Sequence, residues 1–365
     1  MYFLGQAGNF RAKDILRQTF AVATAQSMAK LRQHLAERYQ VEPNRIAFYQ
    51  TGRTALAVAI KATVPKNSKV VITSLTCYAV VEAVKAAGSV PIFADVNPKT
   101  LHFGATELKA TLKKYPDSKA IIIQNNLGIP VDIAAIKRVA GDRVIIEDLA
   151  HCAGVSYPSG EEAGTVGDAT ILSFGKGKSV DAISGGAVIL RDTKLPNPKQ
   201  PTMRPRTSDN LRARFYPLIG ATIRGFYHIK LGRIFTSLML KLHFIQRSAD
   251  APLDFTRRIT YWQAKLALQK LQNLPKNRPP IREFYLVNDR EKVLKELENH
   301  GFIMYDTWYD CPVAPERYYK KVNFPEDECP VAVKLAKQLV NLPTYYGKKA
   351  MDPARKIIAN KGGNK

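Results

Sequence analysis

Short apolar segments that alternate with helical patterns run through the first half of the chain, and they restrict its fold more than any other feature. The apolar segments are rich in β-branched residues, as strands are, and strands are predicted at Lys69–Thr73, 91–95, 120–124 and 144–147. Helices are predicted between them, near 78–87, 105–114 and 132–140. Strands and helices that alternate at this spacing predict an α/β fold with a mainly parallel sheet, covered by helices on both faces.

The length of 365 residues is enough for a large α/β domain and a smaller one. We expect the large domain over 1–200, beginning with a helix near 13–38, then a basic insert over 201–250. A helix and a smaller C-terminal α+β domain are expected over 251–365. No apolar run is long enough for a spanning helix, and the N-terminus lacks the pattern of a signal peptide. The four cysteines form no CxxC pair and no metal-binding spacing, so we expect a cytoplasmic protein with reduced thiols and no metal site.

The net charge of +24 is the unusual feature of the composition. Such an excess suits a membrane surface, polyanionic substrates or nucleic acid, of which nucleic acid is favoured least. It can equally reflect solvated, lysine-rich faces. Two basic segments are expected to lack regular structure: 191–214, which is rich in Pro, Lys and Arg and resembles a linker, and the tail at 355–365.

Residues 215–247 combine large apolar side chains with regularly placed Arg, Lys and His, and no acid occurs from Asn210 through Ala249. This pattern predicts an amphipathic helix or helical hairpin. It suits a membrane interface, where the basic residues would lie near anionic lipid headgroups. The alternative is a pair of helices at a dimer contact, with basic side chains that extend to water.

Two lysines lie between two apolar segments in the stretch ILSFGKGKSVDAISGGAVIL, residues 171–190. We predict a buried strand over 169–174, a polar loop with Lys176 and Lys178, a Gly185-Gly186 turn and a second strand. An amine at the edge of a sheet is partly desolvated, which lowers its pKa and makes it competent to form a Schiff base. The alternative is a solvated Lys/Gly loop without chemistry.

A carboxylate pair, Glu147-Asp148, ends the β-branched run in VIIEDLAHCAG, residues 144–154. The carboxyl end of a parallel strand is where α/β sheets place their ligand sites. An Asp and a Lys are the pair that pyridoxal 5'-phosphate (PLP) requires: the Lys carries the aldehyde, and the Asp keeps the pyridine nitrogen protonated.

The motifs IEDLAHCAG, SFGKGK and SGG, in this order and spacing, resemble the DegT/StrS-type sugar aminotransferases, which have the aspartate-aminotransferase-like PLP fold. The resemblance covers roughly 45–191 and 255–345. It implies that Asp148 is the pyridine partner and that Lys178, four residues after Phe174, is the Schiff-base lysine. Lys176 is out of register for that role.

The resemblance also implies a phosphate-binding turn in QTGRTALAVAIKA, residues 50–62, which opens a helix whose first-turn N–H groups can bind an anion. Gly52, Arg53 and Thr54 would form the turn, with Arg53 in place of the usual Thr and able to add a charge-assisted contact. Ser173 matches a phosphate ligand of the family. The alternative for the turn is an ordinary helix cap.

Other positions depart from the family pattern. His151 stands where Gln is common and would contact the cofactor ring. Cys77 occupies the position of the usual ring-stacking Phe or Trp. Either the neighbouring Tyr78 supplies the ring contact or stacking on the ring is weaker. The alternative for Tyr78 is packing at the start of its helix. Asn125 and Asn126 end a strand and suit loop backbone contacts better than ligand contacts.

The function that this resemblance implies is transfer of an amino group, with glutamate as the expected donor, to a nucleotide-linked keto sugar for a surface glycan. It also implies a homodimer with the active site at the subunit interface, although Thr256 replaces the Asn that the family usually donates to the neighbour's phosphate. A dehydratase of the same fold is disfavoured because that branch replaces the lysine by His. The alternative of another class is a non-catalytic or differently reacting protein of this fold, bound to a membrane or another polyanion.

Overall fold

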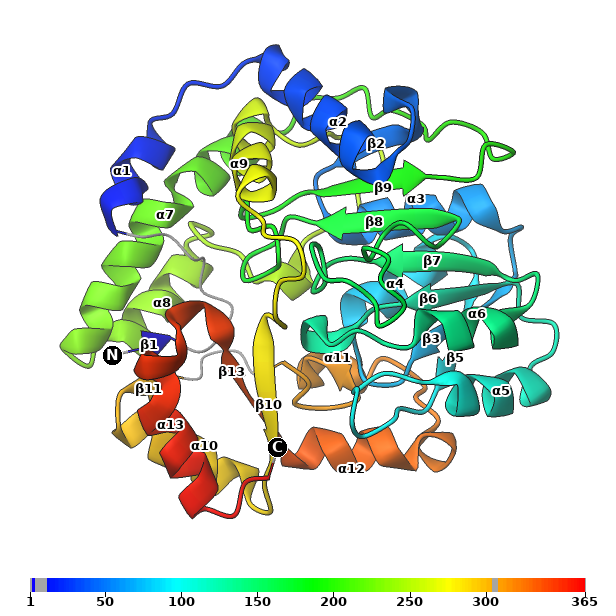
Figure 1. Ribbon diagram of the computed structural model, residues 1–365. Coiled ribbons are helices and arrows are strands. Elements are labelled where there is room, and N and C mark those ends of the chain that lie inside the picture. The colour runs from blue at the N-terminus through cyan, green and yellow to red at the C-terminus, as the bar shows by residue number, and fades with distance from the viewer. Residues whose placement is uncertain (1, 4–11, 304–307, 365) are drawn as a thin grey trace.

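A seven-stranded sheet lies at the centre of the computed structural model, which describes residues 2–3, 12–303 and 308–364 (Figure 1). The strands follow the order β2 (Ile46–Tyr49), β9 (Gly186–Leu190), β8 (Ala169–Ser173), β7 (Val144–Asp148), β6 (Ala120–Ile123), β3 (Lys69–Thr73) and β5 (Val90–Ala94). Strand β9 pairs antiparallel with both of its neighbours, and the remaining pairs are parallel. The predicted mainly parallel sheet is confirmed.

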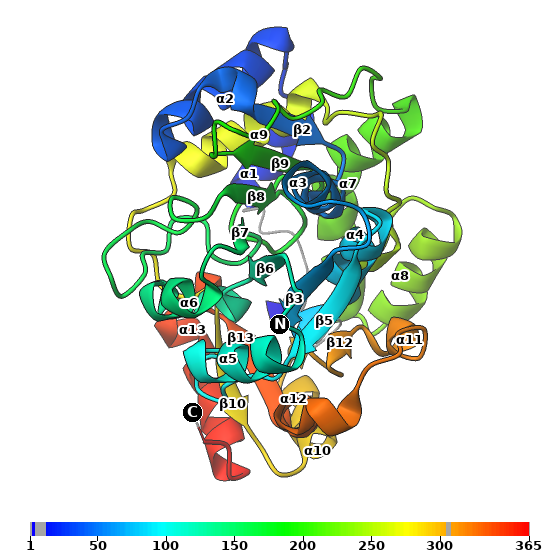
Figure 2. The ribbon, with the colours of Figure 1, turned by 90° about the vertical axis from the view of Figure 1, so that its right-hand side faces the viewer.

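Helices cover both faces of this sheet, as predicted (Figure 2). Successive side chains of a strand point to opposite faces: Ile46 and Phe48 of β2 belong to one core, and Ala47 and Tyr49 to the other. The first core is closed by α2 (Ala25–Tyr39), α5 (Ala105–Lys114), α6 (Ile133–Ala140) and α9 (Tyr261–Gln272). The second is closed by α3 (Gly52–Thr63), α4 (Tyr78–Ala86) and α12 (Pro330–Gln338).

The N-terminal helix predicted near 13–38 is two helices, α1 (Ala12–Thr19) and α2. Thr24 adopts an extended conformation between them and, together with Ser27, caps the start of α2. A Ser or Thr cap can begin a new helix without interrupting the apolar spacing. Periodicity therefore did not reveal the break.

The C-terminal part contains an antiparallel pair, β10 (Arg282–Leu286) with β13 (Leu339–Pro343). Helices α10 (Arg290–Asn299) and α13 (Lys348–Asn360) pack with this pair around a separate core. The expectation of an unstructured tail at 355–365 is wrong, because α13 continues to Asn360 and buries Ala354 and Ile358.

Short parallel pairs connect distant segments. Strand β1 (Tyr2–Phe3) pairs with β11 (Phe302–Ile303), and β4 (Thr76–Cys77) pairs with β12 (Val313–Ala314), which is followed by α11 (Glu316–Tyr319). The β4–β12 pair brings the segment from Trp308 to Pro315 against the carboxyl edge of the central sheet.

The predicted insert is a helical hairpin of α7 (Thr207–His228) and α8 (Gly232–Lys241), beside α1 (Figure 1). Since α7 begins at Thr207, the linker predicted for 191–214 is shorter than expected. Phe226 and Phe235 stack with ring centroids 4.1 Å apart and close the hairpin. No helix of the described residues is long and apolar enough to cross a membrane.

Candidate active site

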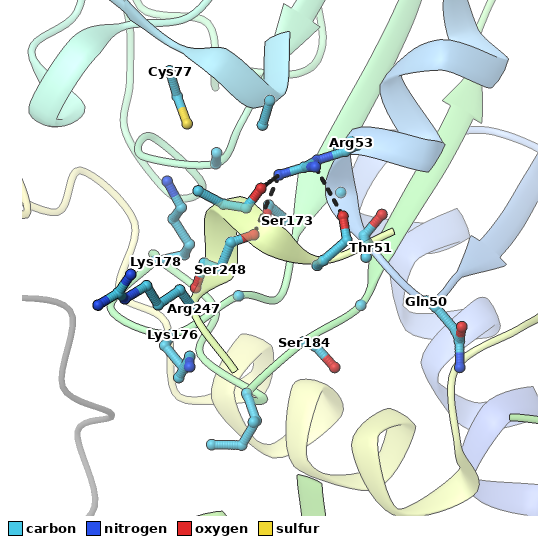
Figure 3. Close-up of a pocket in the computed structure, with 18 of the residues that line it drawn as sticks. Gln50, Thr51, Arg53, Cys77, Ser173, Lys176, Lys178, Ser184, Arg247 and Ser248 are labelled. Carbon is cyan, nitrogen blue, oxygen red and sulfur yellow. Dashed lines mark hydrogen bonds between the residues drawn. The ribbon is translucent and has the colours of Figure 1, made fainter. Parts of the chain in front are cut away.

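A cavity of about 250 Å³ lies at the carboxyl ends of β7 and β8, beside the start of α3. Its walls come from distant segments: Asp148 at the end of β7 and His151 after it, Ser173 at the end of β8 and Lys178 after it, Trp308 and Tyr309 from the C-terminal part, and Arg212, Tyr216 and Arg247 from the insert. Figure 3 shows several of these side chains around the opening. The strands run parallel here, so residues that follow different strands meet at one edge of the sheet.

Lys178 is held inside this cavity by His151, with Nζ 2.9 Å from the imidazole Nε2. Its Nζ lies 4.7 Å from the centre of the Trp308 ring. Burial lowers the pKa of the Lys178 amine below its ordinary value. The desolvated amine predicted from the sequence is therefore present in the structure.

The hydrogen bonds of His151 specify the protonation of this pair. The backbone N–H of Leu127 donates to Nδ1 of His151, at 3.2 Å. Burial lowers the pKa of His151 well below its ordinary value, so the ring is neutral. A neutral ring that accepts at Nδ1 carries its proton on Nε2, and that N–H then donates to the Lys178 nitrogen. This arrangement requires a neutral amine, the form of lysine that can attack a carbonyl.

Lys176 is directed to a different partner. Its ammonium donates to the backbone carbonyl of Gln246 at 2.6 Å and lies over the Tyr216 ring at 4.7 Å. It borders the same cavity, but it contacts the insert and the segment that follows it, whereas Lys178 contacts His151. The geometry therefore supports the assignment of Lys178 as the lysine that carries the cofactor.

Asp148 is buried at the end of β7, where its carboxylate accepts a hydrogen bond from the Ala150 N–H at 2.9 Å. Burial raises the pKa of this carboxyl to about 6, and the hydrogen bond from Ala150 offsets only part of the shift. A buried carboxylate without a full positive partner suits a cationic ligand atom, such as a protonated pyridine nitrogen.

Glu147, the adjacent acid, has a structural role instead. Its carboxylate accepts hydrogen bonds from the N–H groups of Gly164 at 2.7 Å, Val166 at 2.8 Å and Gly167 at 2.6 Å. The Tyr157 hydroxyl donates to it as well, at 2.7 Å. With its acceptor sites taken by the loop at 164–167, Glu147 is not available to a ligand ring.

The start of α3 forms a narrow cradle against the sheet. Thr51 caps the helix by accepting from the Thr54 N–H at 3.1 Å. A Cβ at Gly52 would lie 2.6 Å from Cβ of Ser173, and a Cβ at Gly186 would lie 2.5 Å from Cα of Gly52. Only glycine permits this approach, which brings the first turn of the helix beside the Ser173 hydroxyl. A helix start next to a hydroxyl is suited to a phosphate group.

The structure places two other residues of the predicted turn differently. Arg53 borders the cavity, but its guanidinium is engaged by Glu82 and by the backbone carbonyls of Ser248, Ala249 and Ala251. Figure 3 shows Arg53 beside Ser248. Thr54 does not line the cavity, and its hydroxyl lies 2.9 Å from that of Thr51. Thr51, which was not among the predicted ligands of the turn, lines the cavity instead.

The ring contacts also differ from the expectation. Tyr78 is absent from the cavity wall and stacks on Tyr318 with ring centroids 4.4 Å apart. Cys77 does line the cavity, and Trp308 stacks on His151 with ring centroids 4.4 Å apart. No local motif marks Trp308, and only the β4–β12 pairing brings it to the site. Asn125 and Asn126 serve the loop backbone, as favoured: Asn125 accepts from the Val131 N–H and Asn126 donates to Leu75 and Leu101.

Residues 10–214 match the DegT/DnrJ/EryC1/StrS aminotransferase family, and since this is more than half of the chain, the protein belongs to that family. Its members are PLP-dependent aminotransferases. The chain is 31% identical over 160 residues to GDP-perosamine synthase of Escherichia coli O157:H7, a match that covers 42% of this chain and 43% of the relative. It is 26% identical to UDP-N-acetyl-3-dehydro-alpha-D-glucosamine 3-aminotransferase of Acidithiobacillus ferrooxidans, over 81% of this chain and 78% of that protein.

Among solved structures, the fold is similar to Spr1654 of Streptococcus pneumoniae, which is described as a sugar aminotransferase and was solved in its PMP form. The TM-score is 0.68 at 15% identity, and the match covers 98% of each chain. This similarity confirms the α/β fold class predicted from the sequence.

The residues of the site fit PLP, the cofactor of this family. Asp148 is a buried carboxylate that lacks a full cationic partner, Lys178 is a desolvated amine, and the Gly52–Ser173 approach forms a phosphate-sized cradle. When bound, PLP supplies an electron sink for the substrate carbon. The residues that would hold it are Lys178, Asp148, Thr51, Gly52 and Ser173, with His151 and Trp308 beside the lysine.

Proposed function

We propose that this protein transfers an amino group from glutamate to a nucleotide-linked keto sugar for surface glycan biosynthesis. The observation that carries the proposal is the grouping of Lys178, His151 and Asp148 at one edge of the sheet. Two relatives whose names specify nucleotide-linked sugars, at 31% and 26% identity, support the substrate class.

Each residue of the group has a distinct task. Lys178 would hold the cofactor and would move a proton at the substrate carbon as general base and then as general acid. Its low pKa suits both directions of that transfer. Asp148 holds positive charge at the ring nitrogen, and His151 orients the lysine nitrogen through Nε2.

The activity is tested in two stages. The PLP-loaded protein is first mixed with glutamate alone, and formation of 2-oxoglutarate is measured by mass spectrometry. A panel of nucleotide-linked 3-keto and 4-keto sugars is then added, and the amino sugar is sought. Formation of 2-oxoglutarate and one amino sugar supports the proposal; a chain that takes up no PLP under borohydride trapping would support the non-catalytic alternative.

We also propose a homodimer, as the family resemblance implies. Thr256, which replaces the expected cross-subunit Asn, donates through its N–H and its hydroxyl to Asp254, at 2.9 Å and 2.6 Å, and is thus engaged within its own chain. A cross-subunit contact to the phosphate would then come from other residues. Light scattering of the PLP-loaded protein tests this, and an active monomer would contradict it.

Peripheral association with the inner face of the cytoplasmic membrane is a further part of the proposal. The hairpin and the residues around it expose eight large apolar side chains at 39–69% of their surface: Leu211, Leu218, Ile229, Leu231, Ile234, Leu238, Leu242 and Phe244. Basic residues lie among them, and no acid occurs from Asn210 through Ala249. An anionic bilayer stabilises both sets, at about 1 kcal/mol for each nearby charge.

A further inference from the structure

The segment at 243–251, here called the rim segment, follows the α7–α8 hairpin and borders the mouth of the cavity. Gln246, Arg247, Ser248, Ala249 and Ala251 all line the opening. The C-terminal end of the predicted insert is therefore part of the active-site wall, which the sequence did not indicate.

Backbone carbonyls fix the rim segment to cations of the surrounding elements. Arg212 of α7 donates to His243 O at 2.8 Å, and Lys176 donates to Gln246 O at 2.6 Å. Arg53 donates to the carbonyls of Ser248 at 3.2 Å, Ala249 at 3.0 Å and Ala251 at 2.8 Å.

The acid of the segment is engaged too. Asp250 accepts from Arg317 at 2.8 Å and from the Tyr318 hydroxyl at 2.7 Å. Side chains of α3, α7, α11 and the loop after β8 thus hold the rim segment by its carbonyls and its carboxylate. A segment held at this many points presents its exposed side chains in defined places.

Arg247 is one of these side chains. It is exposed at the mouth of the cavity, and its guanidinium donates no hydrogen bond to any residue that the structure describes. Figure 3 shows it extending toward the side of the opening where Lys176 and Lys178 lie. The other arginines of the wall, Arg53, Arg212 and Arg317, all have partners.

We propose that Arg247 binds the diphosphate group of the keto-sugar substrate at the mouth of the cavity. This inference rests on the proposed function: the sugar carbonyl must reach Lys178 in the interior, so the diphosphate that follows the sugar lies toward the opening. A guanidinium binds phosphoryl oxygens through two parallel N–H donors. The Lys176 ammonium on the same side adds positive charge, which favours a polyvalent anion over a single carboxylate.

A diphosphate can belong to a nucleotide or to a prenyl carrier, and the apolar residues that the hairpin exposes beside the rim segment would suit a lipid-linked substrate. The shared chemistry is the diphosphate. The binding partners to compare are therefore pyrophosphate, a nucleotide set of UDP, GDP and dTDP, and farnesyl diphosphate.

The test uses isothermal titration calorimetry on the full-length, PLP-loaded protein, in which the phosphate cradle of α3 is already filled. Each diphosphate is titrated into the wild type, Arg247→Gln, Arg247→Lys and the control Lys241→Gln. Lys241 is exposed on α8 and does not line the cavity, so its substitution removes the same charge from the hairpin without touching the site.

Arg247→Gln should weaken diphosphate binding about tenfold or more, because a charge-assisted pair is lost. Arg247→Lys should weaken binding less, and Lys241→Gln should bind as the wild type does. Preference for a nucleotide or for farnesyl diphosphate then identifies the carrier. Equal affinities of Arg247→Gln and wild type, or equal losses in Arg247→Gln and Lys241→Gln, would overturn the proposal. Failure of the proposed function is separate, since it shows as absent 2-oxoglutarate formation in the wild type.

Discussion

The two lysines of the loop after β8 differ in what surrounds them as well as in their register with Phe174. Lys178 contacts the neutral imidazole of His151, whereas Lys176 donates to a carbonyl of the rim segment. A primary amine must be unprotonated to attack an aldehyde, and only Lys178 has neighbours that favour that form.

Lys178→Ala should therefore abolish covalent attachment of PLP, and Lys176→Ala should retain it. Borohydride reduction followed by peptide mass mapping measures the modified residue directly. A pyridoxyl group found on Lys176 of the wild type would refute the assignment. A loss of attachment in both variants would show that the loop needs both side chains.

Asp148 gives a prediction that depends on pH. Its pKa is about 6 in the folded protein, against an ordinary value near 3.8, so the cofactor-free fold binds this proton more tightly than the unfolded chain does. This difference leaves the free energy of unfolding unchanged below about pH 4. The free energy of unfolding then falls as the pH rises from about 4 to about 6, and above pH 6 it stays reduced by on the order of 3 kcal/mol.

Cofactor-free Asp148→Asn should accordingly be more stable than cofactor-free wild type at pH 7, and the two should converge near pH 4 in chemical denaturation. PLP binding should reverse this order of stability, because a protonated ring nitrogen stabilises the carboxylate of the wild type and not the amide of the variant. The variant should also lose transamination by several orders of magnitude, since the neutral ring draws off electrons poorly. A stability difference that does not change with pH would contradict this account.

At the scale of elements, one side chain anchors a loop to the sheet. Glu147 of β7 accepts three backbone N–H groups from the loop at 164–167 and the Tyr157 hydroxyl. Glu147→Gln replaces an acceptor oxygen by an NH₂ group, which leaves buried N–H donors unpaired. We expect a loss of about 2–4 kcal/mol in the free energy of unfolding.

Urea denaturation measures this loss, with Glu161→Gln as the matched control on the exposed part of the same region. The control should change stability by less than about 0.5 kcal/mol. PLP attachment should survive in both variants under native conditions. A Glu147→Gln protein as stable as the control would mean that the loop can re-pair its donors elsewhere.

At the scale of the whole molecule, the hairpin's exposed apolar side chains carry the membrane proposal. Ile229 and Ile234 are 63% and 69% exposed. The double variant Ile229→Ser with Ile234→Ser should sediment much less with anionic vesicles than wild type. A matched double variant outside the hairpin, Val90→Ser with Met203→Ser, removes side chains that are 46% and 50% exposed and should sediment normally.

High salt should release wild-type protein only in part, because screening weakens the charge contribution and leaves the apolar one. Equal recovery of wild-type protein in the supernatant with neutral and anionic vesicles would refute membrane association. The hairpin would then be assigned to a subunit contact.

The sequence by itself determined the sheet and the order of its βα units, because those depend on local spacing, and it placed Asp148 at the edge where carboxyl ends of parallel strands meet. The choice of Lys178 and Ser173 came from the resemblance of their motif to the family. It also indicated the hairpin, whose apolar and basic pattern is local. The break between α1 and α2 escaped it, since a capping box leaves the apolar spacing unchanged.

Only the tertiary structure decided which side chains complete the site. Trp308 reaches His151 through the pairing of β4 with β12, and Arg247 reaches the cavity mouth through carbonyls of its own segment that bind Arg53, Arg212 and Lys176. Tyr78 was lost from the site for the same reason, since Tyr318 provides its stacking partner. Such contacts join residues that are remote in sequence, and no local pattern encodes which of several partners a side chain will meet.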